Sequence, residues 1–369
     1  MSRLLAEVGV MNATILISII VCILVLFSLI LFYTKRTPRF SQVLILGNLL
    51  FFSIVIALLL QSDVSPIQWS PVSPFSPVSP LAASSLAVTE VEFGGCLAFV
   101  SNRTGNFEIY MLQGTTDNLN QLTHDPALDI NPAWSPNGEI AFASSRETDQ
   151  GLQLYVMNAD GTHLMRLGPA QPGDNAHPSW SPDGKKIAFQ SKRDINSNPS
   201  DDNLDVYVMN SDGSQIINLT NHEADDSEPA WSPNGQQIAF LSERSGRDEI
   251  YLMNNDGTNP IPLTDMAVPK SSLNWSKDGR FILFEGDSDI YIVDVETRET
   301  LNITQTKDVH ETTPTWVGNE NIIVFASDRA GNWDLYLADI SNPNEILLAR
   351  LTDDPSTDHS PAWFPCNND

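Results

Sequence analysis

A seven-residue pattern, Pro-Ala-Trp-Ser-Pro-Asn-Gly at residues 132–138, constrains the fold of this chain more than any other feature. Three close copies and two degenerate ones follow it, at residues 178–184, 229–235, 273–279, 314–320 and 361–366. Proline presets φ, and Asn, Asp and Gly tolerate positive φ, so Ser-Pro-Asn/Asp-Gly is a turn. Each copy therefore predicts a strand that carries Trp and folds back as a hairpin.

The segments after each turn also repeat. An apolar run ends in Phe, at Phe99, Phe142, Phe189, Phe240, Phe284 and Phe325. An aliphatic residue followed by Tyr comes next, with the tyrosines at Tyr110, Tyr155, Tyr207, Tyr251, Tyr291 and Tyr336. A Leu-Thr-like step then ends most copies, and it has decayed to Leu167-Gly168 in one of them. Each repeat thus predicts four short strands.

Six of the eight tryptophans belong to these copies, and they recur at intervals of 41 to 51 residues. A period in this range, built from four short strands, is typical of one blade of a β-propeller. The sequence therefore predicts an all-β fold over residues 91–369, a six-bladed propeller of four-stranded antiparallel blades. We expect the Trp and Phe side chains to pack between blades. We also expect the arginines that follow the Phe strands to bridge to carboxylates of neighbouring strands, namely Arg103, Arg146, Arg193, Arg244 and Arg329.

The ring is expected to close through both ends of the propeller. If the Trp segment is the innermost strand, the chain enters at a second strand, 97–101, and ends with an unpartnered inner strand, 361–365. The C-terminus then completes the first blade and removes two free strand edges. Cys96 and Cys366 would flank one tight turn, within the Cα separation that a disulfide needs. We predict that they are bonded, with two free thiols as the alternative; an oxidising location agrees with the bond.

Residues 1–62 are expected to anchor the chain in a membrane. Two apolar runs, about 10–33 and 43–60, would form helices of about 36 and 27 Å, near the roughly 30 Å of a bilayer core. The loop between them holds Lys35, Arg36 and Arg39, and short basic loops stay in the cytoplasm. This pattern predicts a multi-pass protein of the cytoplasmic membrane with an extracytoplasmic propeller. The alternative is that the second run is a cleavable signal, although no small-x-small site follows it closely.

The linker at residues 63–90 is rich in Ser and Pro. Prolines at every third residue from Pro71 to Pro80 would line one face of a polyproline II rod. We interpret the linker as a spacer; a ligand for aromatic-lined peptide-binding domains is the alternative.

Charge narrows the choice of partners. Residues 91–369 hold 16 basic and 43 acidic residues, a net charge of −27. Such a surface repels nucleic acid and anionic lipid and favours cationic partners or divalent ions. A solvated acidic surface without a binding role is the alternative.

The repeats resemble the TolB-like, WD-repeat-like β-propeller family of bacterial envelope proteins. The best copies are residues 178–189 (PSWSPDGKKIAF) and 229–257. The resemblance implies the propeller fold across about three-quarters of the chain, but no single function, because similar blades occur in TolB, in peptidases related to prolyl oligopeptidase and in lyases. TolB is described as carrying a small α/β domain where this chain has the apolar runs and the linker. The Pal and TolA partnerships of TolB are therefore not carried over.

Polar loops lead into the inner strands and are expected to gather around one mouth of the central channel. Their candidate binding residues are Asp129, Asp174, His177, Asp226, Glu228, His310, Glu311, Asp358 and His359. The alternative is that they cap strand ends and bond neighbouring backbone groups. We expect no cofactor: the histidines lack close zinc-ligand spacing, and calcium would suit the carboxylates although no D-x-D-x-D-G loop is present.

These features favour a membrane-anchored scaffold that binds a protein or peptide of the cell envelope, for which a basic segment is the best candidate. The alternative is a lyase or hydrolase acting on a glycan, with its site in the channel mouth. A third hypothesis is a sensor whose two helices pair with another membrane protein. The sequence holds no G-x-S-x-G elbow, H-E-x-x-H motif or P-loop, so we lean away from an enzyme.

Overall fold

The computed structural model describes residues 92–147, 151–169, 173–193, 203–318, 321–342 and 346–366. The apolar runs at 10–33 and 43–60 and the linker at 63–90 lie outside these residues, and the predictions made for them stay predictions. Among the described residues, no helix is long and apolar enough to cross a membrane.

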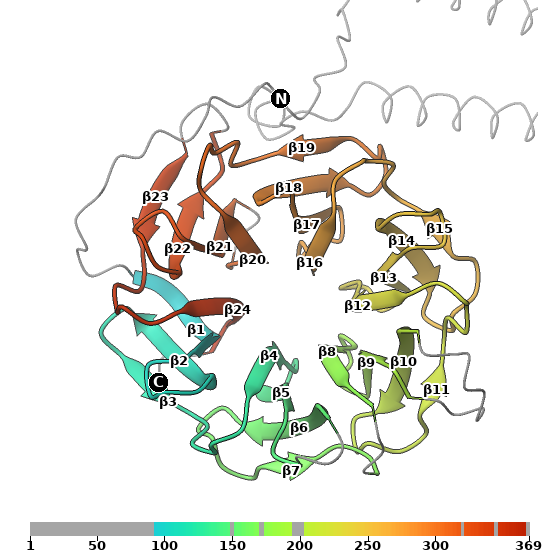
Figure 1. Ribbon diagram of the computed structural model, residues 1–369, viewed down its shortest axis with the longest axis horizontal. Helices are drawn as coiled ribbons and strands as arrows, with labels where there is room; N and C mark the ends of the chain where they lie inside the picture. The colour runs from blue at the N-terminus through green and yellow to red at the C-terminus, as the bar shows by residue number, and fades with distance from the viewer. Residues whose placement is uncertain are drawn as a thin grey trace, which may run out of the picture. The chain divides into compact units, whose positions relative to one another are not determined.

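The described residues form six four-stranded antiparallel sheets arranged as blades around a central opening (Figure 1). Blade 1 is β24-β1-β2-β3, and blades 2 to 6 take their strands in chain order from β4 to β23. The predicted six-bladed propeller is confirmed.

Each blade has four strands, counted from the central opening outward. The inner strands are β24 (Asp358–Phe364), β4 (Asp129–Trp134), β8 (Asn175–Trp180), β12 (Asp226–Trp231), β16 (Lys270–Trp275) and β20 (Glu311–Trp316). The second strands are β1 (Glu92–Ser101), β5 (Glu139–Ser144), β9 (Lys186–Ser191), β13 (Gln237–Ser242), β17 (Phe281–Gly286) and β21 (Ile322–Ser327). The Ser-Pro-Asn/Asp-Gly turns join these two layers, as the sequence predicts.

The outer half of each blade is less regular in length. The third strands are β2 (Glu108–Thr115), β6 (Gln153–Asn158), β10 (Asp205–Asn210), β14 (Glu249–Asn254), β18 (Asp289–Asp294) and β22 (Asp334–Asp339). The outermost strands are β3 (Leu119–Gln121), β7 (Met165–Arg166), β11 (Ile217–Asn218), β15 (Ile261–Pro262), β19 (Thr300–Asn302) and β23 (Leu347–Arg350). These outer strands have two to four residues each, and short edges discourage edge-to-edge pairing with other chains.

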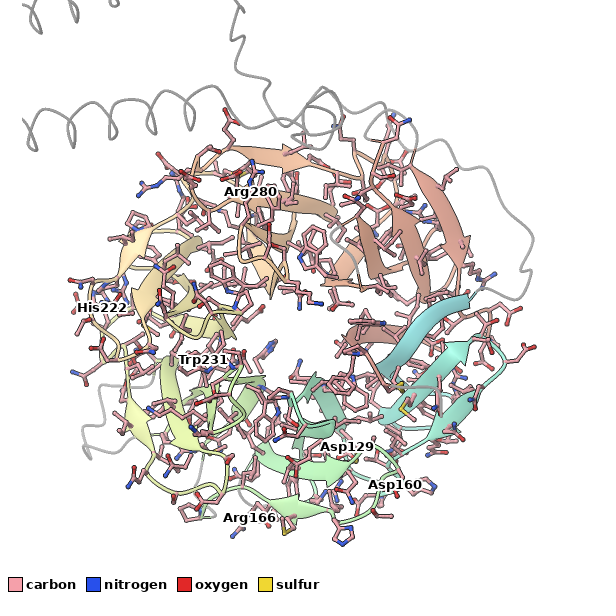
Figure 2. The ribbon with its side chains drawn as sticks, turned by 180° about the vertical axis from the view of Figure 1, so that it is seen from behind. Asp129, Asp160, Arg166, His222, Trp231 and Arg280 are labelled. Atoms are coloured by element: carbon pink, nitrogen blue, oxygen red, sulfur yellow. A yellow bond between two sulfur atoms is a disulfide. The ribbon has the colours of Figure 1, made fainter. Side chains whose placement is uncertain are left out.

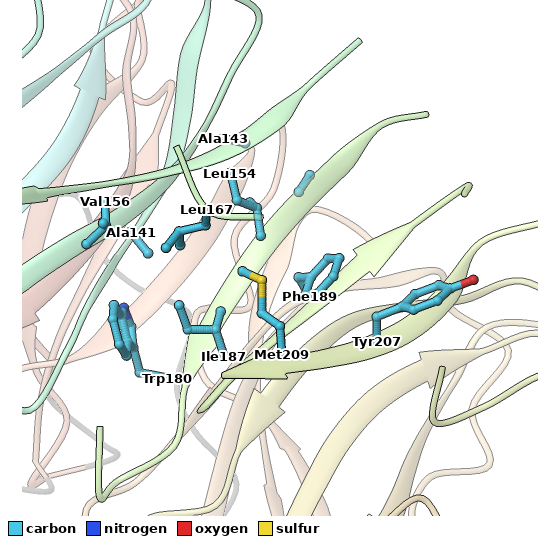
Figure 3. Close-up of a cluster of buried hydrophobic side chains, with 11 residues drawn as sticks. Ala141, Ala143, Leu154, Val156, Leu167, Trp180, Ile187, Phe189, Tyr207 and Met209 are labelled. Carbon is cyan, nitrogen blue, oxygen red and sulfur yellow. The ribbon is translucent and has the colours of Figure 1, made fainter. Parts of the chain in front are cut away.

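The hydrophobic core lies between the blades. Each of six buried clusters among the described residues joins two adjacent blades. Figure 3 shows the cluster between blades 2 and 3, where Leu154 and Leu167 of blade 2 face Ile187 and Met209 of blade 3. The six repeated Phe side chains are fully buried in these clusters, so the expected packing between blades is confirmed for them. Each blade therefore depends on both neighbours for its core.

Blade 1 joins the two ends of the propeller. β24 pairs antiparallel with β1, with Trp363 opposite Leu97. Cys96 and Cys366 form a disulfide with a Cα separation of 5.6 Å across 270 residues of chain. Phe364 stacks on Trp134 of blade 2 at 5.0 Å between ring centroids. The predicted closure and the predicted disulfide are both confirmed.

Candidate functional site

Every inner strand carries a bulge at the same place. In blade 2, Ile130 pairs with Ala143 and Ala133 pairs with Ala141, so two residues of β4 oppose one residue of β5. The register of the other inner strands against their second strands shifts at the equivalent point. A bulge of this kind re-aims a side chain, and bulges are frequent next to functional sites.

The bulge gives the third residue of each inner strand a positive φ, between 49° and 61°. These six residues, named here the bulge ring, are Asn131, His177, Glu228, Ser272, Thr313 and Ser360. None is a glycine, although non-glycine residues seldom adopt this conformation. In five blades the next residue is Pro, which has no N–H to leave unpaired at the bulge.

The bulge ring lines the central channel. The channel encloses about 360 Å³, and its walls also hold the prolines of the bulges and five of the six repeated tryptophans. Figure 2 shows Trp231 near the opening, whereas Asp160, Arg166 and His222 lie at the outer rim of the propeller. The channel is thus a concave surface to which every blade contributes the same short segment.

Tryptophan side chains brace the wall of this channel. The indole N–H of Trp134 donates to the carbonyl of Ala362 at 2.9 Å, and that of Trp180 donates to Ala133 at 3.2 Å. Trp275 and Trp316 repeat the bond to the preceding blade, at 3.0 and 3.2 Å. Trp363 instead donates to Gly94 of its own blade at 2.9 Å. Four of these bonds link neighbouring inner strands directly, which holds the bulge ring in place.

Four of the predicted site residues lie in buried ion pairs behind the channel wall. Asp129 pairs with Arg146, Asp226 with Arg244 and Asp358 with Arg103, at 2.8 to 2.9 Å, and Glu311 pairs with Arg329. Each of these four carboxylates has no exposed surface. Burial raises the pKa of Asp226 and of Glu311 above the ordinary values of their carboxyl groups.

The arginine of each pair also covers aromatic rings of its own blade. The Arg146 guanidinium, for example, lies 4.6 Å from the centroid of the Tyr155 ring and 5.5 Å from that of Phe142. Such contacts add cation–π attraction to the ion pair. The predicted bridging of arginines to carboxylates is confirmed in these four blades.

Blades 3 and 5 replace this ion pair. In blade 3 the Arg193 guanidinium donates to the amide oxygen of Asn175 at 2.5 Å. In blade 5 the buried Lys270 ammonium pairs with Glu249 of blade 4 at 2.9 Å and donates to three backbone carbonyls. Blades 3 and 5 therefore keep a buried polar bond at the first residue of the inner strand, Asn175 or Lys270, but make it with different residues.

Three further predicted residues lie near the loops that lead into the inner strands, outside the channel lining. The exposed Asp174 accepts the backbone N–H of Leu152 at 2.9 Å. His310 bonds through Nδ1 to Asp328 at 2.7 Å, and this hydrogen bond raises the pKa of the imidazole. His359 packs against Phe107, and burial lowers its pKa to about 4.

Of the nine predicted site residues, the structure places His177 and Glu228 in the lining of the channel. Sequence reasoning missed four other members of the bulge ring, namely Asn131, Ser272, Thr313 and Ser360. Their constant position, three residues before each Trp, is a signal that could have found them. Within the described parts of the chain, no group of three or more His, Cys, Asp and Glu side chains could hold a metal ion.

Comparison with known proteins agrees with this geometry. The PD40 family, described as the TolB beta propeller domain, matches residues 93–196 and 170–285, together more than half of the chain. The chain belongs to this family. A TolB homolog of Chlorobium luteolum is 30% identical over 161 residues, which is 42% of this chain and 34% of that protein. An uncharacterized protein of Agrobacterium fabrum is 29% identical over 152 residues, which is 40% of this chain and 51% of that protein.

Among solved structures, TolB from Acinetobacter baumannii superposes with a TM-score of 0.61 at 22% identity. The match covers 74% of this chain and 67% of that TolB chain. At this identity the similarity establishes the propeller fold alone. The chain spans about half or less of the length of the curated relatives it matches, so the TolB beta propeller family accounts for its architecture and leaves its partner open.

Proposed function

We propose that this protein is a binding scaffold that presents the central channel of its propeller to a protein or peptide partner. One comparison among its own blades supports this function. The sixth residue of every inner strand is Trp, and the fourth is Pro in five of six. The third residue, in the bulge ring, differs between most blades, as Asn, His, Glu, Ser, Thr and Ser.

Repeated blades make this comparison informative, because the six copies share one backbone. Positions that the fold requires recur from blade to blade, as Trp and the buried arginine pairs do. The bulge ring keeps its positive φ in all six copies while its side chains vary in charge, size and hydrogen bonding. A rigid frame that displays different side chains toward one cavity is what recognition of a specific ligand needs.

We further propose that the propeller acts outside the cytoplasmic membrane, in the cell envelope, tethered by helices at about 10–33 and 43–60 and held away from the bilayer by the linker at 63–90. Two observations support this location. The three basic residues between the apolar runs favour a cytoplasmic loop. The Cys96–Cys366 disulfide is of a kind that persists in oxidising compartments.

Photocrosslinking tests the binding role. Lys277 is an exposed residue at the channel, so a benzoylphenylalanine placed there would contact a bound partner. Lys185 is also exposed and lies in the equivalent turn of blade 3, but outside the channel lining, which makes it the matched control. In living cells we expect a discrete protein adduct from position 277 and none of the same mass from position 185. Equal adducts from both positions, or none from 277, would rule out the channel as the binding surface.

Cysteine labelling tests the location. In a Cys22→Ala background, Thr37→Cys lies in the basic loop and Ser84→Cys lies in the linker. A membrane-impermeant maleimide should label Ser84→Cys in intact cells and Thr37→Cys only after permeabilisation. The reverse pattern would place the propeller in the cytoplasm.

A further inference from the structure

The bulge ring has one charged acidic member. Glu228 is the single Asp or Glu among the described residues that line the channel, and Lys277, at a turn, is the single Lys or Arg. The bulge ring has the same backbone geometry in every blade, so blade 4 places a carboxylate where the other blades place neutral or imidazole side chains. The channel therefore has one acidic side, at blade 4.

Glu228 is held from two directions, once through its backbone and once through its side chain. Its backbone N–H donates to Gln190 Oε1 of blade 3 at 3.0 Å. Its carboxylate Oε2 accepts the backbone N–H of Ser272 in blade 5. No hydrogen bond joins Oε1 to any residue that the structure describes. The carboxylate is thus oriented by one oxygen, while the other remains available inside the channel.

On the opposite side of the bulge ring, in blades 6 and 1, the hydroxyl groups already make hydrogen bonds within the protein. Thr313 Oγ1 accepts the backbone N–H of Ser360 at 3.1 Å. Ser360 Oγ in turn bonds to Nδ1 of His359 at 2.8 Å. These hydroxyl groups bond within the protein, whereas Glu228 Oε1 and the ring nitrogens of its neighbour His177 make no hydrogen bond to a described residue. Asn131 Oδ1 of blade 2 is also without a hydrogen-bond partner among the described residues, so the unused acceptors of the bulge ring lie in blades 2, 3 and 4, and Glu228 is the charged one among them.

Long-range charge favours a cation at this place. The propeller segment has a net charge of −27, and clefts with low-dielectric walls focus such a field. Inside a channel lined by Trp and Pro, a carboxylate attracts a cation more strongly than it would in open water. The channel volume of about 360 Å³ equals roughly a dozen waters at about 30 Å³ each, so a lysine side chain fits inside it.

We propose that Glu228 receives a single ammonium group in the channel, the side chain of a lysine presented by the partner, beside the ring of His177, which also lines the channel. A guanidinium fits less well, because it prefers two free carboxylate oxygens and Oε2 is already engaged by Ser272. This assignment rests on the proposed function, since it names the group through which the partner enters the channel.

Calorimetric titration of the purified full-length chain with blocked amino acids tests the assignment. N-acetyl-lysine amide should bind measurably below about 10 mM, and N-acetyl-norleucine amide, which lacks the ammonium, should bind at least tenfold more weakly, as expected for the loss of a charge-assisted bond. N-acetyl-arginine amide should also bind more weakly than the lysine probe. Glu228→Gln keeps an oxygen for the Ser272 N–H, and it should weaken binding of the lysine probe at least tenfold.

Glu285→Gln is the matched control, because Glu285 lies on β17, outside the channel lining, and bonds to Ser271. It should leave lysine binding unchanged. Equal binding of the lysine and norleucine probes overturns the assignment on the unaltered chain, even if Glu228→Gln fails to fold. Undiminished binding to a folded Glu228→Gln variant, or tighter binding of the arginine probe, overturns it as well.

The two proposals can fail separately. In cells that carry the Glu228→Gln variant, a crosslinked partner at position 277 in full yield would support the scaffold function and contradict the lysine assignment. If the lysine probe needs Glu228 but no partner crosslinks, the ammonium site stands and the scaffold function falls. Spermidine binding tighter than the lysine probe in that case would point to a free polyamine as the source of the ammonium and would contradict the lysine side chain.

Discussion

Removing the Cys96–Cys366 disulfide is expected to lower the melting temperature of the propeller by about 10 °C. The bond closes a loop with a sequence separation of 270. Loop closure of that length removes about 19 cal/mol/K of entropy from the unfolded chain, or about 5.6 kcal/mol at 25 °C. The unfolding entropy of about 2.1 cal/mol/K per residue amounts to roughly 0.6 kcal/mol/K for the residues between Glu92 and Cys366. The ratio of the two gives the expected shift.

Differential scanning calorimetry of a Cys96→Ala, Cys366→Ala double variant measures this shift. Wild-type protein treated with a reducing agent provides a control that breaks the same bond without changing the buried side chains. Both should melt at the same lower temperature, and the reducing agent should not affect the double variant further. A double variant that melts within about 2 °C of the oxidised wild type would refute the reasoning, since the β24–β1 pairing alone would then hold the ring closed.

Three further outcomes follow from the structure. Gly95→Ala should lower the free energy of unfolding in urea by about 1–3 kcal/mol more than Gly331→Ala does. Both glycines have a positive φ, but of the two only Gly95 would place a Cβ 2.5 Å from a backbone oxygen. Equal losses of stability in the two variants would contradict this close approach. Arg103→Leu should lower the free energy of unfolding by about 3–5 kcal/mol, because it leaves the fully buried carboxylate of Asp358 without its partner. Lys185→Leu removes an exposed ion pair and should change the free energy of unfolding by less than about 1 kcal/mol. Similar urea midpoints for the two variants would contradict a stabilising role of the buried pair. Burial lowers the pKa of His359 to about 4, so between pH 6.5 and 4 the unfolded chain binds a proton that the folded chain does not, and the free energy of unfolding falls as the pH falls. The His359→Gln variant should lose this part of the decline between pH 7 and 5. An unchanged decline in the variant would show that His359 does not cause it.

Much of the fold could be predicted because the repeat places turn residues and large apolar side chains at fixed intervals. Pro-Asn/Asp-Gly after Trp indicates each first hairpin, and six copies indicate the number of blades. Cys96 and Cys366 could be paired because the repeat aligns them with two ends of one turn. Local turn chemistry and repetition suffice for these features, since neither depends on knowing how strands are in register.

The candidate site was predicted less well for a physical reason. Asp129 and Asp358 were expected at the channel mouth because they begin inner strands, yet each side chain turns into a buried ion pair with an arginine. The bulge determines this, since it shifts the register so that the third residue, such as Asn131 or Thr313, lines the channel instead. A bulge belongs to the pairing of two strands, and no single residue type encodes it in the sequence of one.

The sharing of blade 1 between β1 and β24 also determines when the molecule can fold. A ribosome makes Glu92–Ser101 first and Asp358–Phe364 last, so five blades are complete before the first blade receives its inner strand. The nascent chain must then remain an open arc until translation of the propeller has almost ended, and during that time the apolar faces of β1 and of blade 6 lack part of their cover. Ribosome-bound chains stalled at residue 357 should be cut readily by protease within blade 1, and chains stalled long enough to expose residue 366 should not.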